Sequence, residues 1–350
     1  MIPCYANEVR ATQEQDIPLL RDFLIGAFGV APTRAFLQPN LLQWKYFEPR
    51  PDWSEPRSFV LAEREVLLAH IGLWPVTLLV PAGPVPAIQA LDWVRNPAAA
   101  RGAGSLLRQR ALSFVLVQVG AAGTPLAQQA REKAGFRPWA EIQRWAITCR
   151  PWLRYRSRSR TQPGQAIPGL FRDLAAGGIR TGESATPWRY EKVNRFTETV
   201  EPILPAQRLD RIHCAQSPQL LNYLLRCPSI RCEGYLLYRE SELRGCFLLA
   251  RSSPWARLVT LHVREPSLEN LKAAYRAAVQ AALEDPSIWG VVTQVSWRER
   301  QRALARAGFH RSWRAPVALL DSGGLVDRSL PVDLQMSESD TFFLRPEESG

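Results

Sequence analysis

A run of small residues between a strand-like and a helix-like segment is the part of the sequence best suited to chemistry. It reads Val94-Arg95-Asn96-Pro97-Ala98-Ala99-Ala100-Arg101-Gly102-Ala103-Gly104-Ser105. Glycines adopt positive φ and leave no side chain between the backbone and a ligand, and amides at a helix start point outward at the positive end of its dipole. The segment therefore predicts a diphosphate site, to which Arg101 could add a charge. The alternative is a junction whose small residues permit close packing.

Two side chains near this segment have the chemistry of a general base. Asp92 lies two residues before Val94 in an otherwise apolar strand, where partial desolvation would raise its pKa. The structural alternative is a carboxylate that pairs with a neighbouring Arg or caps a loop. His70 is the second candidate, because imidazole titrates near neutral pH and its strand should neighbour that of Asp92. A lone histidine in a strand can equally be a hydrogen-bonded structural residue.

The surrounding sequence predicts the elements that must position these residues. Apolar spacing indicates helices behind Thr12 (from Ile17 to Phe28) and over 37–47, and apolar runs bounded by turn residues indicate strands. The expected strands are 8–12, 58–63, 67–79, 87–94, 116–119 and 137–148, and two further helices are expected over 102–115 and 124–133. A proline-rich turn is expected between the strands 67–79 and 87–94. The order is strand, two helices, three strands, helix, strand, helix, strand.

The second part of the chain repeats the first at a slowly drifting offset. Leu41-Leu42-Gln43-Trp44 returns as Leu220-Leu221-Asn222-Tyr223, and Ala134-Gly135-Phe136 returns as Ala307-Gly308-Phe309. These offsets are 179 and 173 residues, and two further matches between them keep the same order. A period this long indicates a duplicated fold rather than a solenoid. The second copy has Arg264-Glu265-Pro266-Ser267 where the first has its glycines, so we expect it not to bind the same ligand productively.

The element order, the glycine segment and Ala-Gly-Phe together resemble the GCN5-related N-acetyltransferase (GNAT) superfamily. The resemblance covers most of residues 2–149, and a degenerate version covers about 170–320. It implies that Val94, Arg95, Arg101, Gly102, Ala103, Gly104 and Ser105 hold acetyl-CoA, with the Val94 amide polarising the thioester carbonyl. Two departures stand out: Ala99 occupies the first position of the family loop, and Arg131 stands where the family has a tyrosine that protonates the leaving thiolate.

Composition limits the alternatives. The chain has 350 residues and a net charge of +11, which favours anionic partners. Prolines interrupt the most apolar stretch, so we expect no membrane span, and the N-terminus shows no secretory pattern. Six cysteines without paired spacing predict reduced thiols, a cytoplasmic location and no metal site. The arginines from Arg150 to Arg160 form either a soluble linker or a polyanion contact.

These observations predict an α/β (α+β) protein with two tandem GNAT-like domains, each a mixed, mostly antiparallel sheet flanked by helices. The expected boundaries are 1–150 for the acyl-CoA-binding domain, 151–166 for a linker, 167–336 for the degenerate domain and 337–350 for a loosely held tail. The resemblance implies an acyl-CoA-dependent N-acyltransferase acting on a small amine. A weaker similarity to tandem acetyltransferases of bacterial polysaccharide and cell-surface biosynthesis implies an amino-sugar acceptor. The alternatives are a non-catalytic module that binds a polyanion or protein, and an aminoacyl-tRNA-dependent relative of the same duplicated fold.

Overall fold

The computed structural model describes residues 8–64, 66–96, 102–121, 123, 125–161, 188–339 and 343. Its first part contains, in order, β1 (Glu8–Ala11), η1 (Glu14–Asp16), α1 (Ile17–Phe28), η2 (Ala35–Leu37), α2 (Pro39–Tyr46), β2 (Ser58–Glu63), β3 (Val66–Val80), β4 (Gly83–Arg95), α3 (Ala103–Leu112), β5 (Val117–Ala121), α4 (Pro125–Lys133), β6 (Arg137–Thr148) and α5 (Pro151–Thr161).

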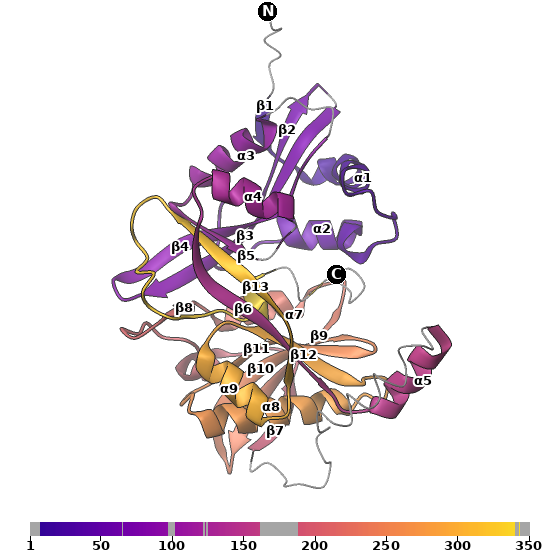
Figure 1. The fold of residues 1–350 in the computed structure, drawn as a ribbon, viewed down its shortest axis with the longest axis vertical. Coiled ribbons are helices and arrows are strands. Elements are labelled where there is room, and N and C mark those ends of the chain that lie inside the picture. The colour runs from indigo at the N-terminus through magenta and orange to yellow at the C-terminus, as the bar shows by residue number, and fades with distance from the viewer. Residues whose placement is uncertain are drawn as a thin grey trace, which may run out of the picture.

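Its second part contains β7 (Trp188–Val193), η3 (Glu198–Ile203), β8 (Ile212–Cys214), α7 (Pro218–Leu225), β9 (Arg231–Arg239), β10 (Glu242–Ser252), β11 (Trp255–Val263), α8 (Leu268–Leu283), β12 (Gly290–Val295), α9 (Arg298–Arg306), β13 (His310–Asp321), β14 (Val332–Asp333) and η4 (Met336–Glu338). From α2 in the first part and α7 in the second, the order is the same: helix, three strands, helix, strand, helix, strand, as the repeat predicts (Figure 1). Before this point the described parts differ, because the first has α1 where the second has η3 and β8.

Strand β4 starts earlier than the sequence predicts. We expected a proline-rich turn before residue 87, but Pro84 and Pro86 lie within the strand and pair in register with Leu79 and Thr77 of β3. Strand β5 joins the other edge of β4 only from Ala87 onward. The two prolines therefore occupy the part of β4 with a single partner strand, where a missing N–H can be tolerated.

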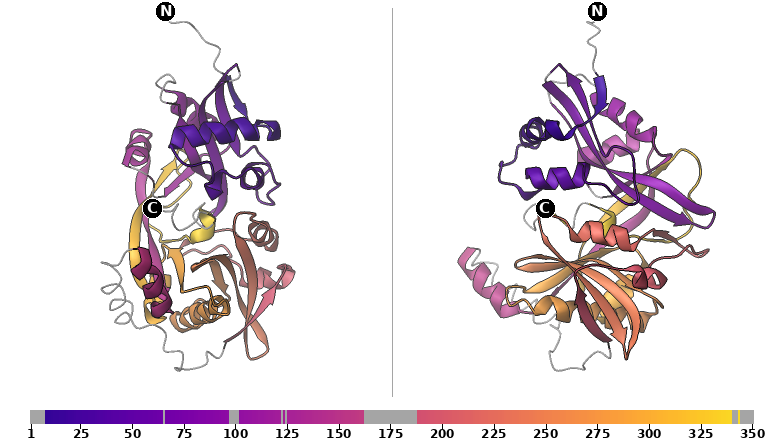
Figure 2. Two further views of the ribbon diagram at one scale, coloured as in Figure 1. Left: turned by 90° about the vertical axis from the view of Figure 1, so that its right-hand side faces the viewer. Right: turned by 180° about the vertical axis from the view of Figure 1, so that it is seen from behind.

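The described strands form one continuous sheet of 14 strands, where the sequence predicts two separate sheets. Its main path runs β1-β2-β3-β4-β5-β13-β6-β12-β11-β10-β9-β7. Along this path the neighbours are antiparallel except at β4–β5 and β11–β12, which are parallel. The helices α3 and α4 lie on one side of the N-terminal strands, while α1 and α2 lie on the other (Figures 1 and 2).

The two parts of the chain exchange their closing strands. Strand β13 pairs antiparallel with β5 of the first part, β6 pairs antiparallel with β12 of the second, and β6 and β13 pair with each other in the middle. In Figure 1 both strands run across the centre of the molecule. This exchange explains why one sheet replaces two. The division into domains at residues 150 and 167 stays a prediction.

The repeated helices α2 and α7 meet at the junction of the two parts. Trp44 and Tyr223, which occupy equivalent positions in the repeat, stack with ring centroids 4.7 Å apart. Each donates to the carbonyl of the other: Trp44 Nε1 to Tyr223 O at 3.3 Å and Tyr223 Oη to Trp44 O at 2.9 Å. Trp74 and Phe343 pack against Trp44, so one aromatic core unites the parts. Aromatic pairs of this kind contribute about 0.5–1.5 kcal/mol beyond their burial.

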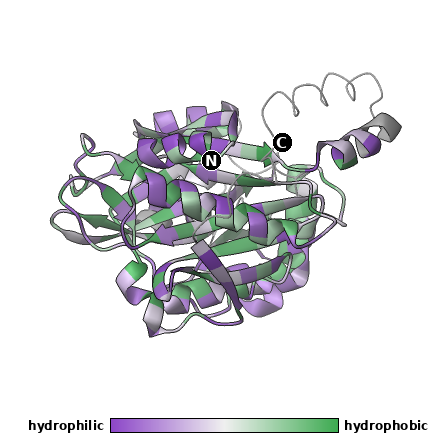
Figure 3. Ribbon diagram, turned by 90° about the horizontal axis from the view of Figure 1, so that it is seen from below, coloured by the Kyte–Doolittle hydropathy of each residue, from purple (hydrophilic) through white to green (hydrophobic). Residues whose placement is uncertain are grey.

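Helix α5 lies within the predicted linker and projects from the rest of the described chain (Figures 1 and 3). Arg150, just before it, donates to the carbonyls of Leu283, Asp285 and Ile288 at the end of α8. Arg154 donates to Thr148 Oγ1 at 3.0 Å. These two arginines of the basic cluster therefore anchor α5. No described helix is long and apolar enough to cross a membrane.

Candidate functional site

Strands β4 and β5 run side by side for only three residue pairs and then part. Their pairing ends at Gln89 and Val119. Strand β4 continues to Arg95 and keeps β3 as its partner as far as the pair Ala69–Arg95. The β5-facing edge of this stretch of β4 is therefore released from the sheet ladder. A parting of two parallel strands in front of a helix start is a place where a ligand can reach backbone groups.

Helix α3 begins beside this opening, directly after a glycine with positive φ. Gly102 has φ of 103°, and no described atom lies within 4 Å of the position that a Cβ would take. Its carbonyl accepts from the amides of Ser105 at 2.8 Å and Leu106 at 3.1 Å. Among the described residues no acceptor faces the amides of Ala103 and Gly104, so this first turn suits an anion. Arg101 lies outside the described residues, and its role stays a prediction.

Gly104 has a packing role as well. A Cβ at this position would stand 3.1 Å from Nε1 of Trp93, because the indole of β4 lies against the helix start. The close-packing alternative raised from the sequence therefore holds for Gly104, whereas nothing described crowds Gly102. This contact also brings the end of β4 and the first turn of α3 to the same place.

Asp92 lies in a β-bulge of β4 with φ of 44°, where the register with β3 shifts between His70 and Gly72. Its carboxylate accepts from Lys45 Nζ and Tyr46 Oη, both at the end of α2. Burial acts to raise the pKa of Asp92, but the ammonium and the hydroxyl stabilise its charged form and the pKa is lowered. The expected raised pKa is therefore wrong: the carboxylate is held in an ion pair, and its partner is a lysine rather than an arginine.

His70 is fully buried between two neighbours. Its Nδ1 lies 3.0 Å from the carbonyl oxygen of Asp92, and its Nε2 lies 2.9 Å from Ser58 Oγ. Because a carbonyl only accepts, Nδ1 carries the proton and Nε2 accepts from the Ser58 hydroxyl. Burial lowers the pKa of His70 to about 4, so the ring is neutral at pH 7. The geometry is that of a hydrogen-bonded structural histidine, and its role as a base stays a prediction.

The other predicted residues of β4 and α3 lie at the same corner. Val94 pairs in register with His70 and packs against the apolar cluster of α1 and α2. Arg95 is exposed at the end of the strand, where its Nη1 donates to Asn96 O at 3.3 Å. Ser105 is exposed on the first turn of α3. Asp92, Val94 and Arg95 thus lie together at the end of β4, whose Trp93 packs against the helix start, but the side chains of Asp92 and Val94 face α2 and its apolar cluster.

Arg131 of α4 covers the end of β5. Its Cδ lies 2.6 Å from the position of a Cβ on Gly120, and its Nη2 lies 2.7 Å from that on Gly123. Glycine at both positions is therefore what lets the side chain lie there. Nε of Arg131 donates to Ala127 O at 3.3 Å, and burial lowers the pKa of the guanidinium. A cation thus stands at the β5 side of the opening.

A buried carboxyl group near the C-terminus was not among the predicted site residues. Glu338 accepts from the amide of Gln335, from Ser337 Oγ at 2.8 Å and from Gln216 Nε2 at 3.1 Å. Burial nevertheless raises the pKa of Glu338 to about 7.

Glu338 borders a small cavity of about 10 Å³ that Gln89 and Val119 also line. These two residues form the last pair before β4 and β5 part. A carboxyl group that titrates near neutral pH therefore lies beside the apex of the opening.

The expected loosely held tail is wrong for the first residues after 336. Ser337, Glu338 and Ser339 are buried, and Phe343 is 1% exposed. The cause is the aromatic core, since the Phe343 ring lies 5.7 Å from Trp44 and 5.9 Å from Trp74. The apolar run around Phe343 is the sequence signal that could have predicted this docking.

The equivalent opening in the second part is filled by the protein itself. Strands β11 and β12 part after Leu258 and Thr293. Beyond this point Gln335 Oε1 accepts from the Leu261 amide at 2.9 Å, and Arg300 Nη1 donates to the Leu261 carbonyl at 2.9 Å. The start of α8 is also capped, because Ser267 Oγ accepts from the Asn270 amide at 3.2 Å. These contacts agree with the expectation that this part does not bind the same ligand.

No family model matches the sequence, and no curated protein matches it. Solved structures do match the fold. A GCN5-related N-acetyltransferase from Anabaena variabilis superposes with a TM-score of 0.60 at 13% identity, over 89% of this chain and 72% of that chain. A conserved protein of unknown function from Enterococcus faecalis, described as a probable N-acyltransferase, superposes with a TM-score of 0.57 at 12% identity, over 91% of this chain and 73% of that chain.

Both similarities extend over about nine tenths of the chain. Identities this low establish the fold and leave the activity to the site. The chain therefore has the GCN5-related N-acetyltransferase fold.

Proposed function

We propose that the protein is an acyl-CoA-dependent N-acyltransferase with a single centre, between β4 and β5. The observation that carries this proposal is the parting of these strands beside a helix start whose first amides are unpaired among the described residues. In this fold a bound acyl-CoA supplies the activated acyl group. The two amides and the open space at Gly102 fit its diphosphate.

The chain's own residues would supply the rest of the chemistry. Attack on a thioester requires an N–H donor for the developing oxyanion and an acceptor for the proton of the nucleophile. We propose a backbone amide at the end of β4, near Val94, as the donor, as the family resemblance implies. For the proton we propose Glu338, because its pKa is about 7 and its carboxyl group, which accepts hydrogen bonds from Gln335, Ser337 and Gln216, lies beside the last pair of β4 and β5. Asp92 is held ionised by Lys45, and both nitrogens of His70 are engaged.

The finer features of the proposal follow the sequence. We propose acetyl as the acyl group and a small-molecule amine or amino sugar as the acceptor, with direct attack. We also propose that residues 1–150 form the CoA-binding unit, 167–336 a degenerate unit that shapes the acceptor cleft, and that the protein acts in the cytoplasm.

The test is calorimetric titration of the full chain with acetyl-CoA and desulfo-CoA. Ser105→Glu places a negative charge on the first turn of α3, where a carboxylate is compatible with the helix dipole but repels a diphosphate. We expect this change to weaken CoA binding at least tenfold. Gly104→Glu is a poorer probe, because its side chain would also displace Trp93.

The matched control is Gln109→Glu, which adds the same charge to an exposed position further along α3. It should leave the affinity for CoA within about twofold of that of the unmodified chain. Equal losses in both variants, or none in either, would argue against a diphosphate site at this helix start. Absence of CoA binding in the unmodified chain would instead favour the non-catalytic alternative.

A further inference from the structure

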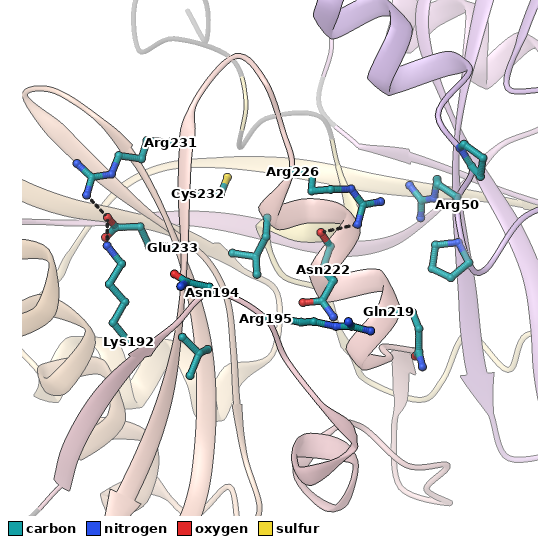
Figure 4. Close-up of a pocket in the computed structure, with 14 residues that line it drawn as sticks. Arg50, Lys192, Asn194, Arg195, Gln219, Asn222, Arg226, Arg231, Cys232 and Glu233 are labelled. Atoms are coloured by element: carbon teal, nitrogen blue, oxygen red, sulfur yellow. Dashed lines mark hydrogen bonds and ion pairs between the residues drawn. The ribbon is translucent and has the colours of Figure 1, made fainter.

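A pocket lies at the junction of the two parts, and none of its lining residues belongs to β4, β5 or α3. It has a volume of about 820 Å³. The loop after α2, from Pro49 to Pro51, forms one wall, and residues of β7, α7 and β9 form the others (Figure 4). A volume of this size is typical of sites for small organic ligands.

One side of this pocket holds a carboxylate that fixes basic side chains in place. Glu233 is buried and pairs with Lys192 at 2.7 Å and with Arg231 at 2.6 Å (Figure 4). Behind it, Arg251 pairs with the same carboxylate at 2.6 Å. Burial acts to raise the pKa of Glu233, but these cations and the Tyr235 hydroxyl outweigh it and hold the pKa at about 2. Glu233 therefore remains charged and orients the cations over the whole neutral range.

The other side holds two arginines that reach into the pocket (Figure 4). Arg226, after α7, donates to Glu48 at 2.7 Å and is 55% exposed. Arg195, in the loop after β7, is exposed and has no ion-pair partner among the described residues. The amides of Gln219 and Asn194 are exposed beside them. This side therefore offers several hydrogen-bond donors, and Glu48 is the one carboxylate described as pairing with them.

Arg50 forms part of the pocket wall and is held from behind. Its Nε and Nη2 donate to Asp52 at 2.9 and 2.8 Å, and its guanidinium lies 4.6 Å from the Trp74 ring and 5.3 Å from the Tyr223 ring. The side chain is only 2% exposed. Its Nη1 is buried and has no hydrogen-bond partner among the described residues. Arg50 is therefore a fixed positive charge in the wall rather than an exposed donor.

The charges do not cancel. Five cations and the Glu233 carboxylate line the pocket, and Glu48 and Asp52 neutralise two of the cations from its margin. Two positive charges therefore remain in excess. We propose that this pocket binds the phosphate or diphosphate group of a small organic molecule, with Arg195 and Arg226 as its donors and Arg50 as a buried positive charge beside them. Arginine suits such a group because its planar fork gives two parallel hydrogen bonds.

The rest of the lining fits an organic portion of the same ligand. Val193, Leu225 and the two prolines of the Pro49–Pro51 loop provide apolar surface beside the arginines. The site is a walled pocket rather than a basic stripe along the surface, so a small ligand fits it better than a nucleic acid.

The experiment is calorimetric titration of the full chain with inorganic pyrophosphate, repeated with a 20-nucleotide single-stranded RNA. Arg195→Gln is the informative variant, because an exposed side chain without a partner can be replaced without disturbing the fold. Loss of a charge-assisted hydrogen bond should weaken pyrophosphate binding about tenfold. Arg239→Gln is the matched control, since Arg239 is an exposed arginine at the far end of β9 and should leave the affinity unchanged.

Two results would overturn the inference. One is pyrophosphate binding that Arg195→Gln leaves intact and that acetyl-CoA abolishes by competition, which would place the anion at the start of α3. The other is RNA binding tighter than pyrophosphate binding and weakened equally by both variants, which would indicate a diffuse basic surface. Selective loss in Arg195→Gln supports the pocket whether or not the protein transfers acyl groups.

Discussion

The two places where parallel strands part, β4–β5 and β11–β12, show how one fold can keep a site in one copy and close it in the other. In both, a ladder of a few pairs ends and the longer strand runs on. At β11 the freed backbone of Leu261 is bound by Gln335 and Arg300. At β4 the chain instead forms a bulge. Among the described residues, no side chain binds the backbone of its β5-facing edge as Gln335 and Arg300 bind that of Leu261. The difference depends on a few side chains rather than on the topology.

The largest effect should come from the ion pair that closes the β11–β12 opening. Arg300 is buried and donates to Asp333 at 2.7 Å, so Arg300→Met leaves the Asp333 carboxylate buried without its partner. We expect a loss of about 3–5 kcal/mol in the free energy of unfolding, measured by urea denaturation. Arg298→Met, an exposed change on the same helix, should cost less than about 0.5 kcal/mol. Equal costs would show that Arg300 does not hold the closed opening together.

A smaller, pH-dependent effect should come from Glu338 at the other opening. Its pKa rises from 4.5 to about 7 on folding, so between these values the folded state binds a proton that the unfolded state has released. Stability from this group is therefore present below about pH 4.5 and is lost as the pH rises towards 7. The loss amounts to at most about 3 kcal/mol, at 1.36 kcal/mol for each pKa unit.

Replacing the group should remove this dependence. We expect the difference in unfolding free energy between unmodified protein and Glu338→Gln to change between pH 5 and pH 8, with the unmodified protein losing more. The two proteins must be compared at each pH, because the buried His70 and His262 also make stability depend on pH. Their pKa values are lowered to about 4 and about 3, so they increase the stability of the folded state as the pH rises over part of this range. A constant difference across the range would mean that the pKa of Glu338 is not raised.

The smallest effect should come from Gln335. Gln335→Ala removes the acceptor of the Leu261 amide and should cost about 1–2 kcal/mol. If the proposed function holds, this variant should still bind one acetyl-CoA per chain in calorimetry, because the start of α8 is capped by Ser267. A second bound acetyl-CoA would show that Gln335 alone closes the second opening.

The sequence was sufficient where local pattern decides the structure. The strands 58–63 and 137–148 match their predicted bounds, because their apolar patterns are continuous and bounded by turn residues. The exchange of β6 and β13 could not be predicted, because either closing strand satisfies the same local pattern.

The candidate site was predictable only in part. The glycines before α3 indicate a helix start with open amides, which the structure has at Gly102. Asp92 was identified as a candidate, but its ion pair depends on Lys45 in a distant helix. Glu338 lies in a segment too short for periodicity, and its burial depends on contacts with strands far away in the sequence.

The exchanged strands have a consequence for synthesis on the ribosome. When Thr148 emerges, β5 has no neighbour on its outer side, because its partner β13 begins only at His310. An unpaired strand edge can recruit other chains and aggregate. The nascent first part therefore lacks its final neighbour on this edge until β13 has been translated, and we expect it to need protection by chaperones during that interval.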